Sequence, residues 1–222
     1  MLREGQVSLP AEIARLLGNR ARSADALGRS RAQVYSCGDL FLKTGPAGTL
    51  ARAAALQAYF AEKHLAQEPV AFVCEDGQDY LLTRREPGVC GCEAELLARP
   101  EELAGRLGEA VRALHETDFS DCPFFGVNER EAGEQAHLLR VDALVHGDCC
   151  LPNLFFSDRG CRFIDLGDAG AGDRHFDLYW ACWSMQYNLK TDRYNARVLD
   201  AYGRDRIDPA RMSLCERISR DE

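Results

Sequence analysis

The residues best suited to chemistry lie between Val145 and Gly167, where two aspartates and an asparagine occur at suggestive spacing. Asp148, in a His-Gly-Asp stretch, is followed five positions later by Asn153, and Asp165 lies in an Ile-Asp-Leu-Gly stretch. Phosphoryl transfer needs a carboxylate to accept the proton of the attacking hydroxyl, and oxygen ligands for a Mg²⁺ ion that bridges the phosphates. We therefore predict Asp148 as the catalytic carboxylate, and Asn153 and Asp165 as metal ligands.

The surroundings of these residues strengthen this interpretation. An aspartate followed by an asparagine is by itself a weak signal, because turns favour both residues. Here an apolar strand over 141–145 leads into the loop, His146 comes two residues before Asp148, and a second apolar stretch over 163–164 precedes Asp165. The combination resembles the catalytic loop and metal-binding aspartate of protein kinases. We expect His146 to shape the loop by hydrogen bonding to the backbone rather than to transfer protons.

The rest of the chain predicts the helices and strands that must position this loop. The first half of the chain predicts a short helix over 10–17, hairpins around Gly38 and Gly77, and an alanine-rich helix over 50–65. The second half predicts helices that begin at Pro100 and that cover 176–187, 193–202 and 209–218. The composition changes near residues 86–88. We therefore predict an α+β protein with two lobes. Residues 1–86 form a small, antiparallel β-rich nucleotide-binding lobe, and residues 87–222 form a larger, mainly helical lobe that carries the catalytic loop and substrate pocket.

Composition narrows the range of partners. The net charge of −8 and the pI near 5.2 argue against nucleic acid or an anionic membrane surface, and they permit a cationic ligand. No run approaches the ~20 apolar residues of a membrane span, and the N-terminus lacks an apolar signal core, so we expect a cytoplasmic protein. The ten cysteines lack zinc-site spacing and are expected to be reduced thiols. The oligomeric state is left open.

The chain resembles the aminoglycoside 3′-phosphotransferases of the kanamycin kinase type, which share the protein-kinase fold. The resemblance covers nearly the whole chain. It implies an enzyme that transfers the γ-phosphoryl group of ATP or GTP, with Mg²⁺, to a hydroxyl of a cationic aminoglycoside, and so confers antibiotic resistance. The stretches that carry it, besides the loop described above, are residues 28–35, 40–43, 114–124 and 173–177.

The resemblance also implies nucleotide contacts. Lys43 would pair with the α- and β-phosphates, Phe41 would stack on adenine, and the loop that contains Ser30 would cover the phosphates. The backbone near Arg84 and Glu86, in the hinge, would hydrogen-bond the edge of the adenine ring.

Three departures from the family pattern affect this interpretation. No acidic residue lies between Thr44 and Ala61, where kinases place the glutamate that orients the lysine. Only 23 residues separate Cys122 from His146, a shortened form of the segment that supplies the family's acidic substrate contacts. Asp168 occupies a position where several relatives carry arginine. The carboxylates that remain as candidates for binding substrate ammonium groups are Asp168, Glu131, Glu134, Asp221 and Glu222.

Two alternatives remain. A kinase of another small hydroxyl compound, such as a choline-like, macrolide or sugar substrate, would have the same catalytic loop and differ only in its pocket. A nucleotide-binding pseudokinase would explain the missing helix glutamate and the shortened segment. The presence of Asp148, Asn153 and Asp165 argues against the pseudokinase, because a chain without catalysis has no physical need of all three.

Overall fold

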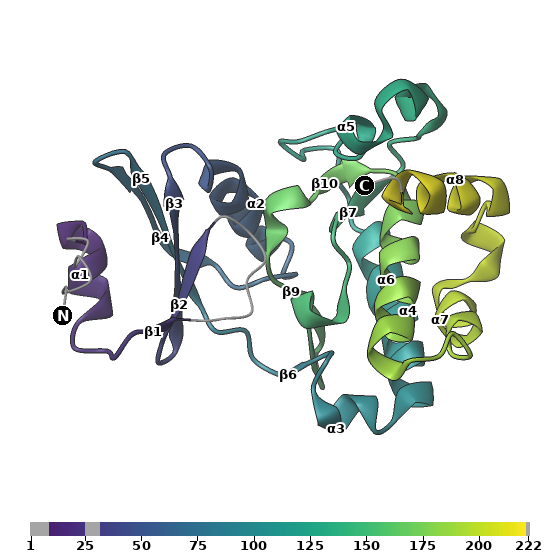
Figure 1. Ribbon diagram of the computed structural model, residues 1–222, viewed down its shortest axis with the longest axis horizontal. Helices are drawn as coiled ribbons and strands as arrows, with labels where there is room; N and C mark the ends of the chain where they lie inside the picture. The colour runs from purple at the N-terminus through teal and green to yellow at the C-terminus, as the bar shows by residue number, and fades with distance from the viewer. Residues whose placement is uncertain (1–8, 25–31, 221–222) are drawn as a thin grey trace. The chain divides into compact units, whose positions relative to one another are not determined.

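The computed structural model describes residues 9–24 and 32–220 of the 222-residue chain. These residues divide into two compact units. The first contains residues 9–24, 32–58 and 67–85, and the second contains residues 59–66 and 86–220 (Figure 1). Within the described ranges, no helix is long and apolar enough to cross a membrane. The ten cysteines are all free thiols, and half of them are buried.

The first unit is built on a five-stranded antiparallel sheet in the order β1-β2-β3-β5-β4. Both predicted hairpins are present, and their turns contain the positive φ angles that such tight turns need: 71° at Gly38 and 74° at Gly77. The elements of this unit are α1 (Ala11–Leu17), β1 (Ser23–Ala24), β2 (Gln33–Cys37), β3 (Leu40–Pro46), the start of α2 (Ala51–Glu62), β4 (Pro69–Glu75) and β5 (Gln78–Arg84).

The core of the first unit lies between α1 and the sheet. Ile13 and Leu17 of the helix pack with Leu42 and Leu82, which point to one face of their strands, and all four are buried. On β5, the buried carboxylate of Asp79 accepts a hydrogen bond from the Leu50 N–H at 2.9 Å, directly before α2 begins. This bond satisfies a helix N-terminus that would otherwise leave its N–H groups without partners.

The second unit is mainly helical, with two small antiparallel sheets, β6-β8-β9 and β10-β7. The predicted α+β composition is confirmed. Its helices and strands are α3 (Ala94–Leu97), α4 (Pro100–His115), α5 (Glu129–Ala132), α6 (Arg174–Leu189), α7 (Asn195–Tyr202), α8 (Pro209–Arg220), β6 (Val89–Cys90), β7 (Ala143–Val145), β8 (Leu154–Ser157), β9 (Gly160–Phe163) and β10 (Gly170–Gly172). Short 3₁₀ helices are η1 (Gly133–Leu138), η2 (Leu151–Asn153), η3 (Leu166–Asp168) and η4 (Arg204–Arg206).

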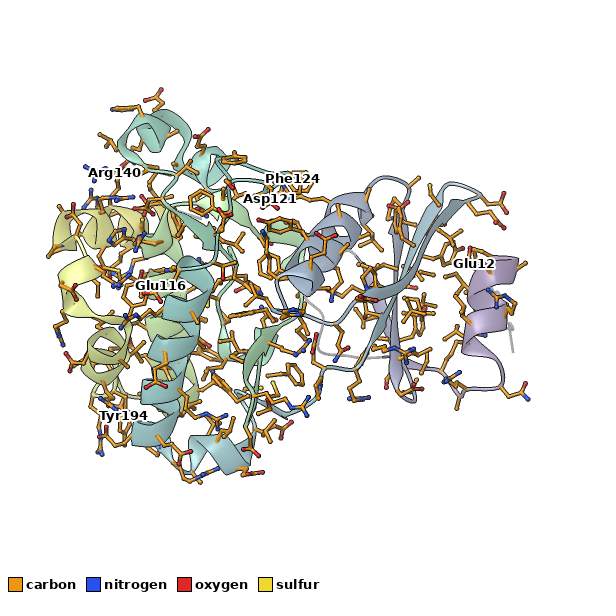
Figure 2. All side chains as sticks on the ribbon, turned by 180° about the vertical axis from the view of Figure 1, so that it is seen from behind. Glu12, Glu116, Asp121, Phe124, Arg140 and Tyr194 are labelled. Carbon is orange, nitrogen blue, oxygen red and sulfur yellow. The ribbon has the colours of Figure 1, made fainter. Side chains whose placement is uncertain are left out.

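Within the second unit, residues 59–66 are held in place by the loop that follows α4. Figure 2 shows Asp121 on this loop, where its carboxylate accepts hydrogen bonds from Tyr59 Oη and Lys63 Nζ, each at 2.9 Å. The Leu65 carbonyl accepts a 2.8 Å bond from the N–H of Phe163 in β9. The end of α2 is thereby linked to the hairpin that precedes Asp165.

The structure corrects several expected boundaries. The helix predicted over 50–65 ends at Glu62, because His64 adopts a φ of 61° and the Leu65 N–H bonds back to the Phe60 carbonyl. Of the apolar stretch predicted at 163–164, only Phe163 belongs to a strand: it ends β9, which begins at Gly160. The partner strand β8 was not predicted at all. Strand β8 directly follows the loop motif, and its four residues are too few for periodicity to identify.

Helices α4, α6 and α7 lie side by side in the second unit (Figure 1). Gly108 of α4 is buried where α7 approaches most closely. A Cβ atom at this position would overlap the Val198 carbonyl oxygen and would lie 2.8 Å from the Ala201 Cβ and 2.9 Å from the Tyr202 nitrogen. Two of these three neighbours are backbone atoms, so they cannot move without displacing α7.

Gly108→Ala should therefore lower the free energy of unfolding by about 1–3 kcal/mol, because overpacking outweighs the gain in helix propensity. Gly105→Ala is the matched control on the same helix. Its new Cβ would meet only the flexible guanidinium of Arg197, at 3.1 Å. Urea unfolding should find the Gly105 variant at least as stable as the wild type. Equal effects at the two positions would contradict this account of the interface.

Candidate active site

The loop that carries Asp148 is anchored by Asp177, which lies in the first turn of α6. The Asp177 carboxylate is fully buried and accepts hydrogen bonds from the backbone N–H groups of His146 at 2.7 Å and Gly147 at 2.9 Å. His115 Nε2 of α4 lies 3.2 Å from the same carboxylate. A buried carboxylate is stable only when such donors surround it, so the two bonds from the loop specify where the loop must lie.

Gly147 allows this loop to approach the next one closely. Its φ of 84° is in the left-handed region. A Cβ atom there would overlap the backbone carbonyl group of Asp168. Only glycine can adopt this φ readily and also leave room for that carbonyl group. The backbone beside Asp148 can therefore lie directly against the 3₁₀ turn that carries Asp168.

Asn153 holds the Asp148 loop in shape. Its Nδ2 donates to the Asp148 carbonyl oxygen at 3.0 Å and to the Asp148 carboxylate Oδ2 at 2.9 Å. Farther along the loop, the Leu151 N–H donates to the Oγ of Ser184, in α6, at 2.9 Å. The Asp148 carboxylate is thus positioned by a side chain from its own loop, and that loop is bound to α6 at two places.

His146 joins the two predicted loops. The Asp148 N–H donates to His146 Nδ1 at 3.2 Å, which makes Nδ1 an acceptor and places the ring proton on Nε2. Nε2 then donates to the Ile164 carbonyl oxygen at 2.9 Å, and the Ile164 N–H donates to the Asn153 carbonyl at 3.0 Å. This confirms the expected backbone hydrogen bonding of His146. Asp165 follows Ile164 directly, so its backbone is tied to the loop that carries Asp148.

Asp165 is exposed and adopts a left-handed conformation, with φ 59° and ψ 56°. Aspartate tolerates this region better than most residues. The nitrogen of the Asn153 side-chain amide is committed to Asp148, so Oδ1 is the atom that Asn153 can offer to a cation. An amide oxygen and a carboxylate are ligands of the kind that Mg²⁺ takes, and their chemistry therefore fits the predicted metal.

A cavity of about 290 Å³ opens beside Asp148, entirely within the second unit. Its wall combines two carboxylates, two other polar side chains, an indole ring and apolar groups. The Oγ of Ser219 is buried without a hydrogen-bond partner among the described residues, which leaves it available to a ligand. The lining residues are Val127, Asn128, Gly147, Asp148, Asp168, Phe176, Trp180 and Ser219.

A buried ionic network supports the wall of this cavity. Asp173 caps α6 by accepting from the His175 N–H at 3.0 Å, and it also binds His175 Nδ1 at 2.8 Å and Arg211 Nε at 3.1 Å. The backbone N–H of Arg140, labelled in Figure 2, adds a bond at 3.2 Å. Burial alone would raise the pKa of Asp173, but the bonds from His175, Arg211 and Arg140 outweigh it and lower this pKa to about 2. The Asp173 N–H in turn donates to Asn128 Oδ1 in the cavity wall at 3.3 Å.

The predicted substrate carboxylates do not all reach the cavity. Asp168 lines it, whereas Glu134 lies exposed on η1 and is not among the lining residues. Asp142, also an available carboxylate by sequence, forms salt bridges with Arg174 at 3.2 Å and Arg211 at 3.0 Å. Three predicted positions fall outside the described residues: Asp221, Glu222 and the side chain of Glu131.

The predicted nucleotide contacts fall mostly on the first unit. Lys43 is half-buried on β3, between Val34 of β2 and Leu81 of β5. The guanidinium carbon of Arg85 lies 4.5 Å from the centre of the Phe41 ring, so a cation contacts one face of that ring.

The two hinge residues differ in exposure. Arg84 is exposed, 3.7 Å from Asp39, while Glu86 is buried. Ser30 lies outside the described residues. The nucleotide-binding roles of this group stay predictions.

Sequence reasoning assigned no role to four important residues: Asp177, Asn128, Trp180 and Ser219. Asp177 lies four positions after Asp173, at the start of a predicted helix, and this spacing could have marked it as a partner for the preceding loop. Nothing in the sequence distinguishes the other three, because tertiary packing alone brings them to the cavity.

The fold and loop chemistry define a phosphotransferase, and comparisons with known proteins agree. Residues 136–215 match the model of the phosphotransferase enzyme family. A probable aminoglycoside 3′-phosphotransferase from Lactococcus lactis is 36% identical in an alignment 207 residues long, and the match covers 78% of this chain and 79% of the relative. The chain therefore belongs to the aminoglycoside phosphotransferase family.

Solved structures support the kinase-like fold. An aminoglycoside 3′-phosphotransferase of type VIII has a TM-score of 0.71 at 20% identity, covering 94% of this chain and 97% of the other. An aminoglycoside phosphotransferase from Streptomyces rimosus, solved with ADP and streptomycin, also has a TM-score of 0.71, at 18% identity and with 93% and 94% coverage. These similarities confirm the predicted fold class.

The low pKa of Asp173 leads to a prediction about acid stability. An unfolded aspartate titrates near pH ~3.9, so the stability that this carboxylate contributes is fully present above about pH 4 and is lost as the pH falls toward about 2. Asp173→Asn should lower the free energy of unfolding at pH 7 by about 3 kcal/mol, and the gap to wild type should narrow at pH 3.

Urea unfolding followed by circular dichroism at both pH values measures this gap. Asp192→Asn, at an exposed position of the same unit, is the control and should change little at either pH. A gap for Asp173→Asn that is the same at pH 3 and pH 7 would mean that the ionic network is not what Asp173 contributes.

Proposed function

We propose that this enzyme transfers the γ-phosphoryl group of ATP to a hydroxyl of an aminoglycoside such as kanamycin, with Asp148 as the catalytic carboxylate. The observation that carries the proposal is the position of Asp148. It lines the cavity beside Asp168, and its carboxylate is oriented by Asn153 on a loop that Asp177 anchors. The relatives named above, which carry aminoglycoside phosphotransferase names, support the same substrate class.

Asp148 would orient the substrate hydroxyl and accept its proton as the phosphoryl group is transferred. The anchored loop keeps the carboxylate in place before substrate binds, so little reorganisation remains for the reaction itself. The adjacent Cys150 does not compete as a nucleophile. Burial, with the charge of Asp148 nearby, raises the pKa of its thiol far above the ordinary value, and the thiol stays protonated at neutral pH.

Asn153 Oδ1 and the Asp165 carboxylate would hold the Mg²⁺ ion. When bound, the ion would neutralise charge on the phosphates. Helix α2 has no acidic residue before Glu62, so Lys43 would have to be oriented without the helix glutamate that kinases use. The complete set of Asp148, Asn153 and Asp165, joined by hydrogen bonds through their loops, favours an active kinase over a pseudokinase.

The cavity favours a cationic, hydroxyl-rich substrate. Asp148 and Asp168 attract ammonium groups, Asn128 and Ser219 offer hydrogen-bond partners, and Trp180 offers an aromatic face. The net charge of −8 adds long-range attraction for a cation. A neutral sugar could only donate hydrogen bonds to the carboxylates and would form no ion pair with them, and this difference separates the aminoglycoside from that alternative.

Asp148→Asn should lower kcat for kanamycin phosphorylation by about 10²–10⁴-fold and leave nucleotide affinity nearly intact, because the side chain meets the hydroxyl and not the nucleotide. Steady-state kinetics and nucleotide titration measure the two effects. Asp165→Ala is the comparison, since loss of a metal ligand should weaken Mg²⁺-dependent nucleotide binding as well as turnover. An Asp148 variant that keeps more than about a tenth of the wild-type kcat would remove this residue from the catalytic role.

Asp168→Asn should raise the KM for kanamycin about fivefold, because an exposed ion pair contributes up to about 1 kcal/mol. The affinity of the wild type for the drug should also fall with added salt, since salt screens partly exposed ion pairs over a Debye length of ~8–10 Å. Steady-state kinetics measures the KM, and calorimetric titration of kanamycin at low and high salt measures the affinity. Asp158→Asn, an exposed carboxylate outside the cavity, should bind like wild type. Salt-independent binding would point to a neutral or singly charged substrate.

A further inference from the structure

Helix α6 carries a strip of aromatic side chains, Trp180, Trp183 and Tyr187. Their spacing of three and four residues places them on one face of the helix. The rings of Trp180 and Trp183 meet edge to face with centroids 5.4 Å apart, and those of Trp183 and Tyr187 are stacked at 5.0 Å with an interplanar angle of 13°. The three rings therefore support one another and form an ordered surface.

The outer part of this strip is exposed. Trp183 is 37% exposed and Tyr187 is 50% exposed, while the opposite face of α6 buries Leu178, Ala181 and Met185 in the core. Exposed neighbouring aromatic rings keep apolar area in contact with water, and such surfaces usually mark binding sites. The core packing of α6 does not require aromatic residues at these two positions.

The strip begins in the wall of the cavity. Trp180 lines the cavity together with Asp148, and Trp183 and Tyr187 continue along α6 by about 4.5 and 10 Å, at the helical rise of ~1.5 Å per residue. The cavity volume of about 290 Å³ is at the low end of the roughly 300–1,000 Å³ that ligand pockets have. A substrate of several rings would therefore extend beyond the cavity, and the strip is the aromatic surface that continues from its wall.

We propose that Trp180, Trp183 and Tyr187 form a stacking platform for the part of an aminoglycoside that extends beyond the phosphorylated ring. This inference rests on the proposed function. The apolar C–H face of a sugar ring packs against the indole and phenol rings, and its ammonium groups are attracted to their π faces. Lys190 Nζ lies 4.2 Å from the centre of the Tyr187 ring and disfavours a further cation there, so Trp183 is the main contact outside the cavity.

Fluorescence tests this platform directly, because Trp180 and Trp183 are the only two tryptophans of the chain. Trp180→Phe leaves Trp183 as the single indole. Titration of this variant with kanamycin, which has three rings, should change the emission intensity or wavelength, whereas neamine, which lacks the third ring, should leave it nearly unchanged. Trp183→Phe leaves only Trp180, whose emission should respond to both drugs. If the emission of Trp183 does not change at a saturating concentration of kanamycin, the proposal is overturned.

Kinetics gives the second measurement. Trp183→Ala should lower kcat/KM for kanamycin about five- to tenfold, change that for neamine less than twofold, and leave the KM for ATP unchanged. Trp183→Phe should restore most of the kanamycin activity. Phe72→Ala, which removes an exposed aromatic ring from β4 in the other unit, is the matched control and should behave like wild type.

The possible outcomes separate the platform from a structural role of Trp183 and from failure of the proposed function. Equal losses for kanamycin and neamine in Trp183→Ala would show a structural role and overturn the platform. Wild-type kinetics for both drugs in that variant would also overturn it, and would leave the strip as a surface for a protein partner. A wild-type enzyme that phosphorylates no aminoglycoside would refute the proposed function itself, and the platform with it. Phosphorylation of both drugs without a Trp183 effect refutes the platform alone.

Discussion

The buried carboxylate of Asp177 is the contact on which the active-site geometry depends. Removing a carboxylate from water is costly, and here the loss of hydration is offset by the N–H groups of His146 and Gly147 and by His115. His115 Nδ1 lies 2.9 Å from the hydroxyl of Tyr202, which links the anchor to α7. The loop that carries Asp148 is therefore fixed by the helical core of its own unit.

The two loops that carry the proposed catalytic and metal-binding residues are held together as one assembly. His146 and Asn153 both bond to the backbone of Ile164, and the absence of a side chain at Gly147 lets the Asp168 turn lie against the first loop. Preorganised groups lower a reaction barrier because no energy is spent in ordering them during the reaction. Helix α6 supports this assembly with Asp177 and Ser184, and its Trp180 lines the cavity.

Much of the fold and the loop could be predicted from the sequence, for local reasons. The hairpins follow from glycines at tight turns, α4 follows from its apolar period, and the loop follows from the short spacing of Asp148, Asn153 and Asp165. The carboxylates that could contact substrate were harder to predict from the sequence. Glu134 and Asp168 are both acidic residues in short polar segments, yet only Asp168 lines the cavity. Asp142, acidic as well, is engaged by two arginines distant in sequence.

The class of chemistry follows from the amino-acid sequence alone, because an aspartate and an asparagine on one loop, with a second aspartate following, suit a hydroxyl nucleophile and a metal-bridged phosphate. The residues that surround this chemistry are known only from the three-dimensional fold. Asn128, Trp180 and Ser219 come from three separate segments, and Asp177 reaches the loop from a later helix. These contacts join residues that are far apart in the sequence, so they depend on how the helices pack against one another. Local propensity and periodicity contain no information about that packing.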